Sequence, residues 1–129
     1  MLAADTNVVL RLVIADDRLQ HERAVQLFAT NKVWIAKTVM LEANWVLRSR
    51  YHYSDRGAAA LLVIISGLTN AVLEDRRTVI EALTLVGNGV DFADALHLAS
   101  RGSADRFVTF DRKLARRARK AGITAIAEL

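Results

Sequence analysis

The fold class is decided by residues 106–129, RFVTFDRKLARRARKAGITAIAEL. Residues 106–110 are short, apolar and rich in β-forming residues, which is typical of a buried strand. Residues 111–122 favour a helix, and Gly122 stands just past its end, where glycine is common. Residues 123–129 are again short and apolar. A strand, a helix and a second strand in direct succession predict two parallel strands joined by a helix.

The remaining chain repeats this alternation of short apolar strands and helical periods. Thr38 and Ser54 are candidate N-caps of two helices. The alternation favours a mostly parallel sheet covered by helices on both faces, in which ligands bind at the carboxyl ends of the strands. The predicted strands are 1–4, 32–36 and 71–74, and the predicted helices are 5–13, 21–31, 38–51, 54–67, 75–89 and 91–102.

The composition is that of a globular protein and excludes several kinds of site. Of the 129 residues, 53% are hydrophobic and 25% are charged, so the chain has enough apolar surface for a core. No linker, repeat or low-complexity tract divides it, and we expect a single domain over residues 1–129. The lack of cysteine excludes disulfides, thiol nucleophiles and cysteine-ligated zinc.

Neither a signal peptide nor a membrane span is expected. The N-terminal residues lack a basic start followed by a long apolar run, and the longest apolar run, residues 58–68, is too short to cross a bilayer. These features favour a cytoplasmic protein. The net charge of +4 and the isoelectric point of about 10.0 permit a polyanionic partner such as nucleic acid.

Acidic residues stand where the predicted parallel strands end. Asp5 directly follows the first strand, and Asp111 directly follows strand 106–110. Glu42 lies one turn into the helix after strand 32–36. Because parallel strands end at the same edge of a sheet, we expect these three carboxylates to lie close together.

Several of these acids also have a purely structural interpretation. Asp5 and Asp111 suit helix N-caps, each worth about 1 kcal/mol. Asp91, with Asp94 three residues later, is typical of a capping pair at the start of helix 91–102. The level of this helix relative to the strand ends leaves open whether it adds a fourth carboxylate to the edge.

Glu42 is harder to explain as a structural residue. Its neighbours at helical spacing are apolar, namely Val39, Trp45 and Val46. A carboxylate within an apolar stripe is costly unless it is paired or binds a metal. A buried ion pair with Arg48 or Arg11 is the structural alternative.

Converging carboxylates require a compensating cation. Two of them about 4 Å apart repel by roughly 4 kcal/mol at an effective dielectric constant of about 20. A site with oxygen ligands only, and without cysteine, suits Mg²⁺ or Mn²⁺. Such ions activate water for attack on phosphorus, so the pattern predicts metal-dependent hydrolysis of a phosphodiester.

Four stretches of the chain resemble the acidic motifs of the PIN-domain ribonucleases. They are ADTNVVLRLV (4–13), TVMLEANWVL (38–47), DFADALHLA (91–99) and VTFDRKLARRA (108–118). More narrowly, the chain resembles the VapC-type toxins of type II toxin–antitoxin pairs. The resemblance extends over essentially the whole chain, with the four motifs in the family's order.

The resemblance implies a three-layer α/β/α fold with a central, mostly parallel sheet. It also implies an endoribonuclease that uses Mg²⁺ or Mn²⁺. By position, the resemblance makes Asp5, Glu42, Asp94 and Asp111 the catalytic and metal-binding acids. The residues expected to support them are Thr6, Asn7 and Thr109, together with Asp91, which we interpret mainly as the cap of its helix.

The partners expected from this resemblance are RNA, a cognate antitoxin protein and a second copy of the chain. An acidic centre repels RNA, so phosphate contacts must come from basic residues around it. The candidates are Arg112, Lys113, Arg116, Arg117, Arg119 and Lys120, with Arg48 and Arg50 after Glu42. The apolar segments 21–28 and 60–68 are candidates for the homodimer contact, although core packing explains them equally well.

Two other functions remain open. One is a non-catalytic nucleic-acid-binding module of the same fold, in which the acids only cap helices. The other is a phospho-acceptor signalling domain, which also gathers aspartates around Mg²⁺ at the end of a parallel sheet. The lack of a lysine at a comparable strand end weakens this second alternative, since Lys113 lies within a helical turn.

Overall fold

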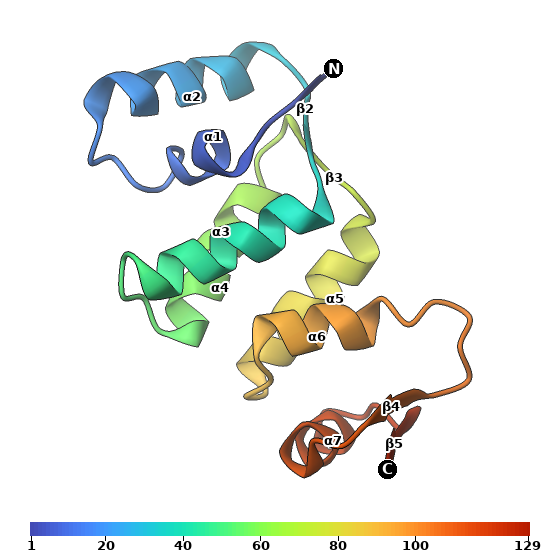
Figure 1. Ribbon diagram of the computed structural model, residues 1–129. Coiled ribbons are helices and arrows are strands. Elements are labelled where there is room, and N and C mark those ends of the chain that lie inside the picture. The colour runs from blue at the N-terminus through green and yellow to red at the C-terminus, as the bar shows by residue number, and fades with distance from the viewer. The chain divides into compact units, whose positions relative to one another are not determined.

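The computed structural model describes all 129 residues, which form two compact units, Met1–Arg76 and Arg77–Leu129. Every element predicted from the sequence is present, with bounds shifted by a few residues (Figure 1). The first unit contains β1 (Leu2–Ala3), α1 (Thr6–Leu10), α2 (Arg18–Thr30), β2 (Val33–Ile35), α3 (Lys37–Ser49), α4 (Asp55–Ser66) and β3 (Ala71–Leu73). The second unit begins at Arg77 and so contains nearly all of α5 (Arg76–Gly87). Its other elements are α6 (Phe92–Ala99), β4 (Phe107–Thr109), α7 (Arg112–Lys120) and β5 (Ile126–Glu128).

All the strand pairs are parallel, which confirms the predicted α/β class. In the first unit the strand order is β1-β2-β3, with Val33 of β2 paired to Leu2 on one side and to Ala71 on the other. In the second unit β4 pairs with β5, and Phe107 lies opposite Ile126. The strand–helix–strand interpretation of residues 106–129 is therefore confirmed. The single domain expected over residues 1–129 stays a prediction.

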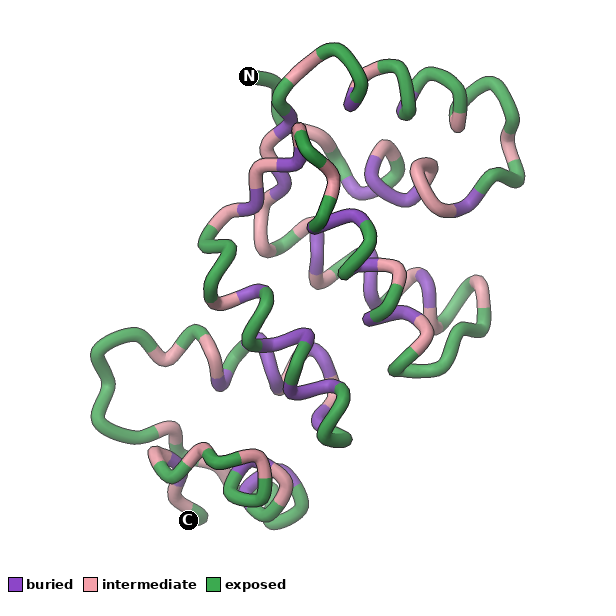
Figure 2. Tube along the Cα trace, turned by 180° about the vertical axis from the view of Figure 1, so that it is seen from behind, coloured by how far each residue is buried: buried purple, intermediate pink, exposed green.

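The core of the first unit lies around α3, which packs against α1 and α4. Its buried residues recur at helical spacing, and the same pattern appears in α4 (Figure 2). The fully buried residues of these helices are mostly aliphatic, namely Met40, Ala43, Leu47, Ala58, Leu62 and Ile65. No helix of the structure combines the length and the apolar character needed to cross a bilayer.

Two predicted helix ends are confirmed. The Ser54 hydroxyl accepts a hydrogen bond from the Gly57 amide at 3.0 Å, as expected of an N-cap. Gly122 follows the end of α7 and has a φ of +92°, a conformation that other residues adopt only with strain.

Two other predicted helix limits are wrong. The N-cap of α3 is Ala36, not Thr38, and no side chain of the helix caps it. Instead the Glu74 carboxylate, just past β3, accepts a hydrogen bond from the Lys37 amide at 2.8 Å. The helix that starts after Asp5 ends at Leu10, short of residue 13, and α2 begins separately with Asp17 as its cap.

Candidate active site

Asp5 lies between β1 and α1, at the carboxyl end of its strand. It is exposed, and its Oδ1 accepts a hydrogen bond from the Val8 amide at 3.1 Å. Asp5 is therefore the N-cap of α1, while its second carboxylate oxygen is not used in the cap. Next to it, Thr6 is buried and Asn7 is exposed.

Glu42 is exposed on α3, so the expectation that it lies in an apolar environment is wrong. The neighbouring Trp45 is 61% exposed, because this side of the helix faces solvent. The two arginines considered as its partners are paired elsewhere: Arg48 donates to Asp55 at 3.0 Å, and Arg11 is paired with Asp16. The position of Glu42 carries no desolvation penalty that a metal would have to offset.

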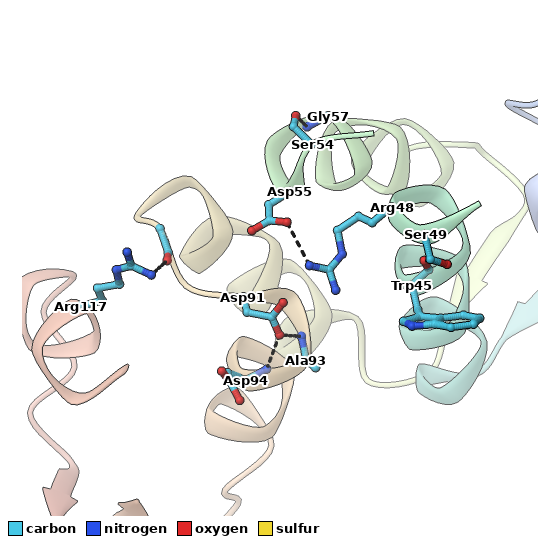
Figure 3. Close-up of polar contacts among 11 residues, drawn as sticks. Trp45, Arg48, Ser49, Ser54, Asp55, Gly57, Asp91, Ala93, Asp94 and Arg117 are labelled. Carbon is cyan, nitrogen blue, oxygen red and sulfur yellow. Dashed lines mark hydrogen bonds and ion pairs between the residues drawn. The ribbon is translucent and has the colours of Figure 1, made fainter. Parts of the chain in front are cut away.

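Helix α6 places Asp91 and Asp94 in different environments (Figure 3). Asp91 is the N-cap, and its Oδ2 accepts hydrogen bonds from the amides of Ala93 and Asp94 at 3.0 and 3.4 Å. The capping role predicted for Asp91 is confirmed. Asp94 lies one turn further on, partly buried, and its carboxylate is not part of the cap.

Asp111 lies between β4 and α7, where it caps the helix. Its Oδ1 accepts a hydrogen bond from the Leu114 amide at 3.0 Å. The Thr109 hydroxyl accepts a hydrogen bond from the Asp111 amide at 3.0 Å, which holds the turn that carries the carboxylate. Thr109 thus contacts the residue that it was expected to support.

Three acidic residues of the second unit, Asp91, Asp94 and Asp111, lie near one another. They line a small pocket of about 50 Å³, together with Lys113 and Arg117. Burial, and then the negative charges of Asp91 and Asp111, raise the pKa of Asp94, while the nearby His97 lowers it. The side chain of Asp94 therefore lies close enough to other acids for its own ionisation to be opposed.

This crowding predicts a pH-dependent stability of the metal-free protein. Because folding raises the pKa of Asp94, this residue contributes to stability in its protonated form. The contribution is complete below the ordinary carboxyl pKa and is lost as the pH rises through the raised value. At neutral pH we expect Asp94→Asn to melt at a higher temperature than wild type. Its free energy of unfolding should be higher by less than about 1 kcal/mol, because solvent screens the site. Thermal melts in chelator across the acidic range measure the difference.

The control for these melts is Asp105→Asn, which removes an exposed carboxylate of the same unit. Its melting curve is expected to follow wild type at every pH. If Asp94→Asn melts at or below the wild-type temperature at neutral pH, the acids around Asp94 do not destabilise the folded state.

The side chains of the acidic residues suit a hard divalent ion. Carboxylate oxygens are the ligands that Mg²⁺ and Mn²⁺ prefer, and a cation relieves the repulsion that raises the pKa of Asp94. No group of three or more histidine, aspartate or glutamate side chains is positioned to hold an ion. Asp5 and Glu42 belong to the first unit, and Asp94 and Asp111 to the second.

Basic residues surround the start of α7. Arg112, Lys113 and Arg116 are exposed, and α7 begins directly after Asp111. Arg117, another of the expected phosphate contacts, donates to the Gly89 carbonyl at 2.7 Å and lines the acidic pocket (Figure 3).

Asn44 was not singled out from the sequence. It is 2% exposed, and its amide nitrogen makes no hydrogen bond. The only sequence signal was a polar residue within the apolar side of helix 38–51. On α3, Asn44 therefore lies on the side that faces the core, whereas Glu42 lies in solvent.

Comparison with known families identifies the chain. The family model described as PIN domain matches residues 3–120. A comparison with curated proteins gives no match. The family match confirms the predicted PIN-like α/β fold, whereas the narrower resemblance to VapC-type toxins stays a prediction. Proteins with this domain are typically nucleases. The chain belongs to the PIN domain family.

Proposed function

We propose that this chain is a cytoplasmic, metal-dependent endoribonuclease that acts as the toxin of a type II toxin–antitoxin pair. The observation that carries the proposal is the meeting of Asp94 and Asp111 in one pocket, where the pKa of Asp94 is raised. A crowded group of carboxylates on a nuclease fold favours a cation-dependent phosphodiester hydrolase over a set of helix caps. The family membership supports the nuclease part of the proposal.

The resemblance makes Asp5, Glu42, Asp94 and Asp111 the proposed metal ligands, and of these Asp94 and Asp111 line one pocket. A bound Mg²⁺ or Mn²⁺ lowers the pKa of a coordinated water and stabilises negative charge on the scissile phosphate. Asp5 and Asp111 each keep one oxygen outside their capping hydrogen bonds, so both can act as ligands without loss of a cap. A carboxylate of this group orients the attacking water and accepts its proton.

RNA is held by basic residues next to the acids. Arg112, Lys113 and Arg116 are the best candidates because they are exposed immediately after Asp111. Arg48 is a weaker candidate, since its guanidinium is engaged with Asp55. Thr109 and Asp91 support the site through the turn and the cap that carry Asp111 and Asp94.

The proposed protein partners are a second copy of the chain and an antitoxin that blocks the acidic site. Three large apolar side chains are 45 to 57% exposed on the two helices expected to form the homodimer contact. They are Val25 of α2 and Val63 and Ile64 of α4. An apolar groove of about 540 Å³ lies between these helices, lined by Phe28 and Leu68 among others. Exposed apolar residues around a groove support a protein contact at this face.

The test is cleavage of a structured RNA by the purified protein. We expect cleavage with Mg²⁺ or Mn²⁺, loss of cleavage when the ion is chelated, and recovery when excess ion is returned. Cleavage that persists unchanged in chelator contradicts the metal-dependent mechanism. RNA binding without cleavage under every metal condition favours the non-catalytic module, and labelling of an aspartate by acetyl phosphate favours the phospho-acceptor domain.

A further inference from the structure

A second pocket in the first unit opens beside Asp5. It lies between α1 and α2 and has a volume of about 380 Å³, within the range of pockets that bind small molecules. Its lining combines charged, amide and apolar side chains, chiefly Asp5, Val8, Arg11, Gln20, Arg23 and Leu27. Asn7 lines it as well. Of the lining residues only Asp5 and Asn7 belong to the catalytic site expected from the sequence, and Arg23 and Leu27 lie in the segment 21–28 that is a candidate for the homodimer contact.

Arg11 forms a fixed wall of this pocket. Its Nε donates to the Gln20 Oε1 at 2.7 Å, and its Nη1 is paired with Asp16. Its carbonyl oxygen lies 2.6 Å from the His21 Nδ1. The positive charge of Arg11 is therefore balanced by Asp16, and its side chain is held in place by contacts that link the two helices.

Arg23 differs from the other arginines around α2. It is exposed and makes no ion pair, and its helical neighbours Leu19, Gln20 and Leu27 carry no charge. On the same helix, by contrast, Arg18 is paired with Glu22 at 3.0 Å. Arg23 thus presents a guanidinium without an ion pair at a pocket that Asp5 also lines.

We propose that this pocket binds one nucleotide of the RNA substrate, adjacent to the scissile phosphate. Arg23 contacts the phosphate of that nucleotide, and the apolar wall of Val8 and Leu27 lies against its base. The inference rests on the proposed ribonuclease function, because it takes Asp5 as part of the catalytic site. An acidic protein segment is the competing occupant, and the experiment below distinguishes the two.

The experiment measures binding of a short fluorescein-labelled RNA of mixed sequence by anisotropy, in the Asp94→Asn background to prevent cleavage. Arg23→Ala is expected to weaken binding about tenfold at low salt, as loss of a charge-assisted contact to phosphate does. It is also expected to reduce the slope of log K against log salt by about 0.7, the value for one single-strand phosphate. Arg23→Lys is expected to restore that slope, because it restores the charge.

The matched control is Arg18→Ala, which removes the same charge from the same helix but away from the pocket. We expect its binding to stay within about twofold of the parent. Equal losses in the two variants would mean a general charge effect and overturn the proposal, and so would no loss in either. Both variants should keep the far-ultraviolet spectrum and the melting temperature of the parent.

Cleavage assays separate this proposal from the nuclease proposal. With Asp94 restored, Arg23→Ala should raise KM and leave kcat unchanged, because it removes a contact made equally in ground state and transition state. RNA binding that depends on Arg23 in a protein that cleaves no RNA supports the pocket and contradicts the nuclease. Efficient cleavage by Arg23→Ala with unchanged KM overturns the pocket alone. A glutamate-rich peptide that displaces the RNA, and whose own binding requires Arg23, would assign the pocket to protein instead.

Discussion

Replacing Asp94 with asparagine will lower the rate of RNA cleavage at least about a hundredfold while the protein stays folded. Loss of a group that only supports a metal ligand commonly costs 10- to 100-fold, so loss of a ligand should cost more. Asparagine has nearly the shape of aspartate, and the Asp94 side chain takes no part in the helix cap. The variant therefore removes the negative charge with little change in packing. Initial rates at saturating Mg²⁺, with circular dichroism of the same samples, measure the effect.

Asp5→Asn provides an independent check of the same assignment. Asparagine is as good an N-cap as aspartate, so the start of α1 should remain intact while the charge is lost. We expect a loss of similar size, and wild-type activity in the control Asp105→Asn. If both Asp94→Asn and Asp5→Asn cleave RNA within about tenfold of wild type, the carboxylates do not hold a catalytic ion.

The elements that local sequence signals determine were predictable. Ser54 followed by Asp55 starts a helix, Gly122 ends one, and Asp91 caps α6. Each of these effects is local, because it depends on a hydrogen bond to a nearby amide or on the backbone angles of the residue itself. The strand at 106–110 and the strand at 123–129 follow from composition and from the helix between them. These signals need no information about distant parts of the chain.

The features that depend on distant residues were not predictable. The start of α3 is held by Glu74, thirty-seven residues away from Lys37, so the local candidate Thr38 was misleading. Glu42 has apolar neighbours on its helix, yet its side chain is exposed. Its neighbour Trp45 is 61% exposed, so the rest of the fold does not cover this side of the helix. A helical pattern shows which residues share a face, but it does not show which face the rest of the fold covers.

The same limit applies to the candidate site. The strand order placed Asp111 at a strand end but left the level of Asp94 open, and only the family resemblance assigned both to one site; the structure brings the two to one pocket. The pocket beside Asp5 was not foreseen, since it arises from the packing of α1 on α2 and from the contacts of Arg11 with Gln20 and Asp16. Such a network joins side chains whose spacing follows no helical or strand period.

Phe92→Ala is expected to destabilise the protein by about 3–5 kcal/mol, the usual effect of emptying a buried aromatic site. Phe92 is only 1% exposed and lies between Asp91 and Asp94 in the first turn of α6. Because domains of this size are stable by about 5–15 kcal/mol, the variant should lose a large part of its stability. Urea unfolding followed by circular dichroism measures the change.

The control for Phe92→Ala is Val108→Ala, on a side chain that is 57% exposed, where we expect a change within about 0.5 kcal/mol. A loss below about 1 kcal/mol at Phe92 would mean that α6 is not anchored by this ring. Comparison with Asp94→Asn then separates an effect on folding from an effect on the site, although both residues lie in the first turn of α6. Phe92→Ala should reduce cleavage only in proportion to the fraction of protein that unfolds, and a more stabilising solution should restore it. Asp94→Asn should stay inactive under the same conditions, because what it lacks is a charge in the site and not a folded helix.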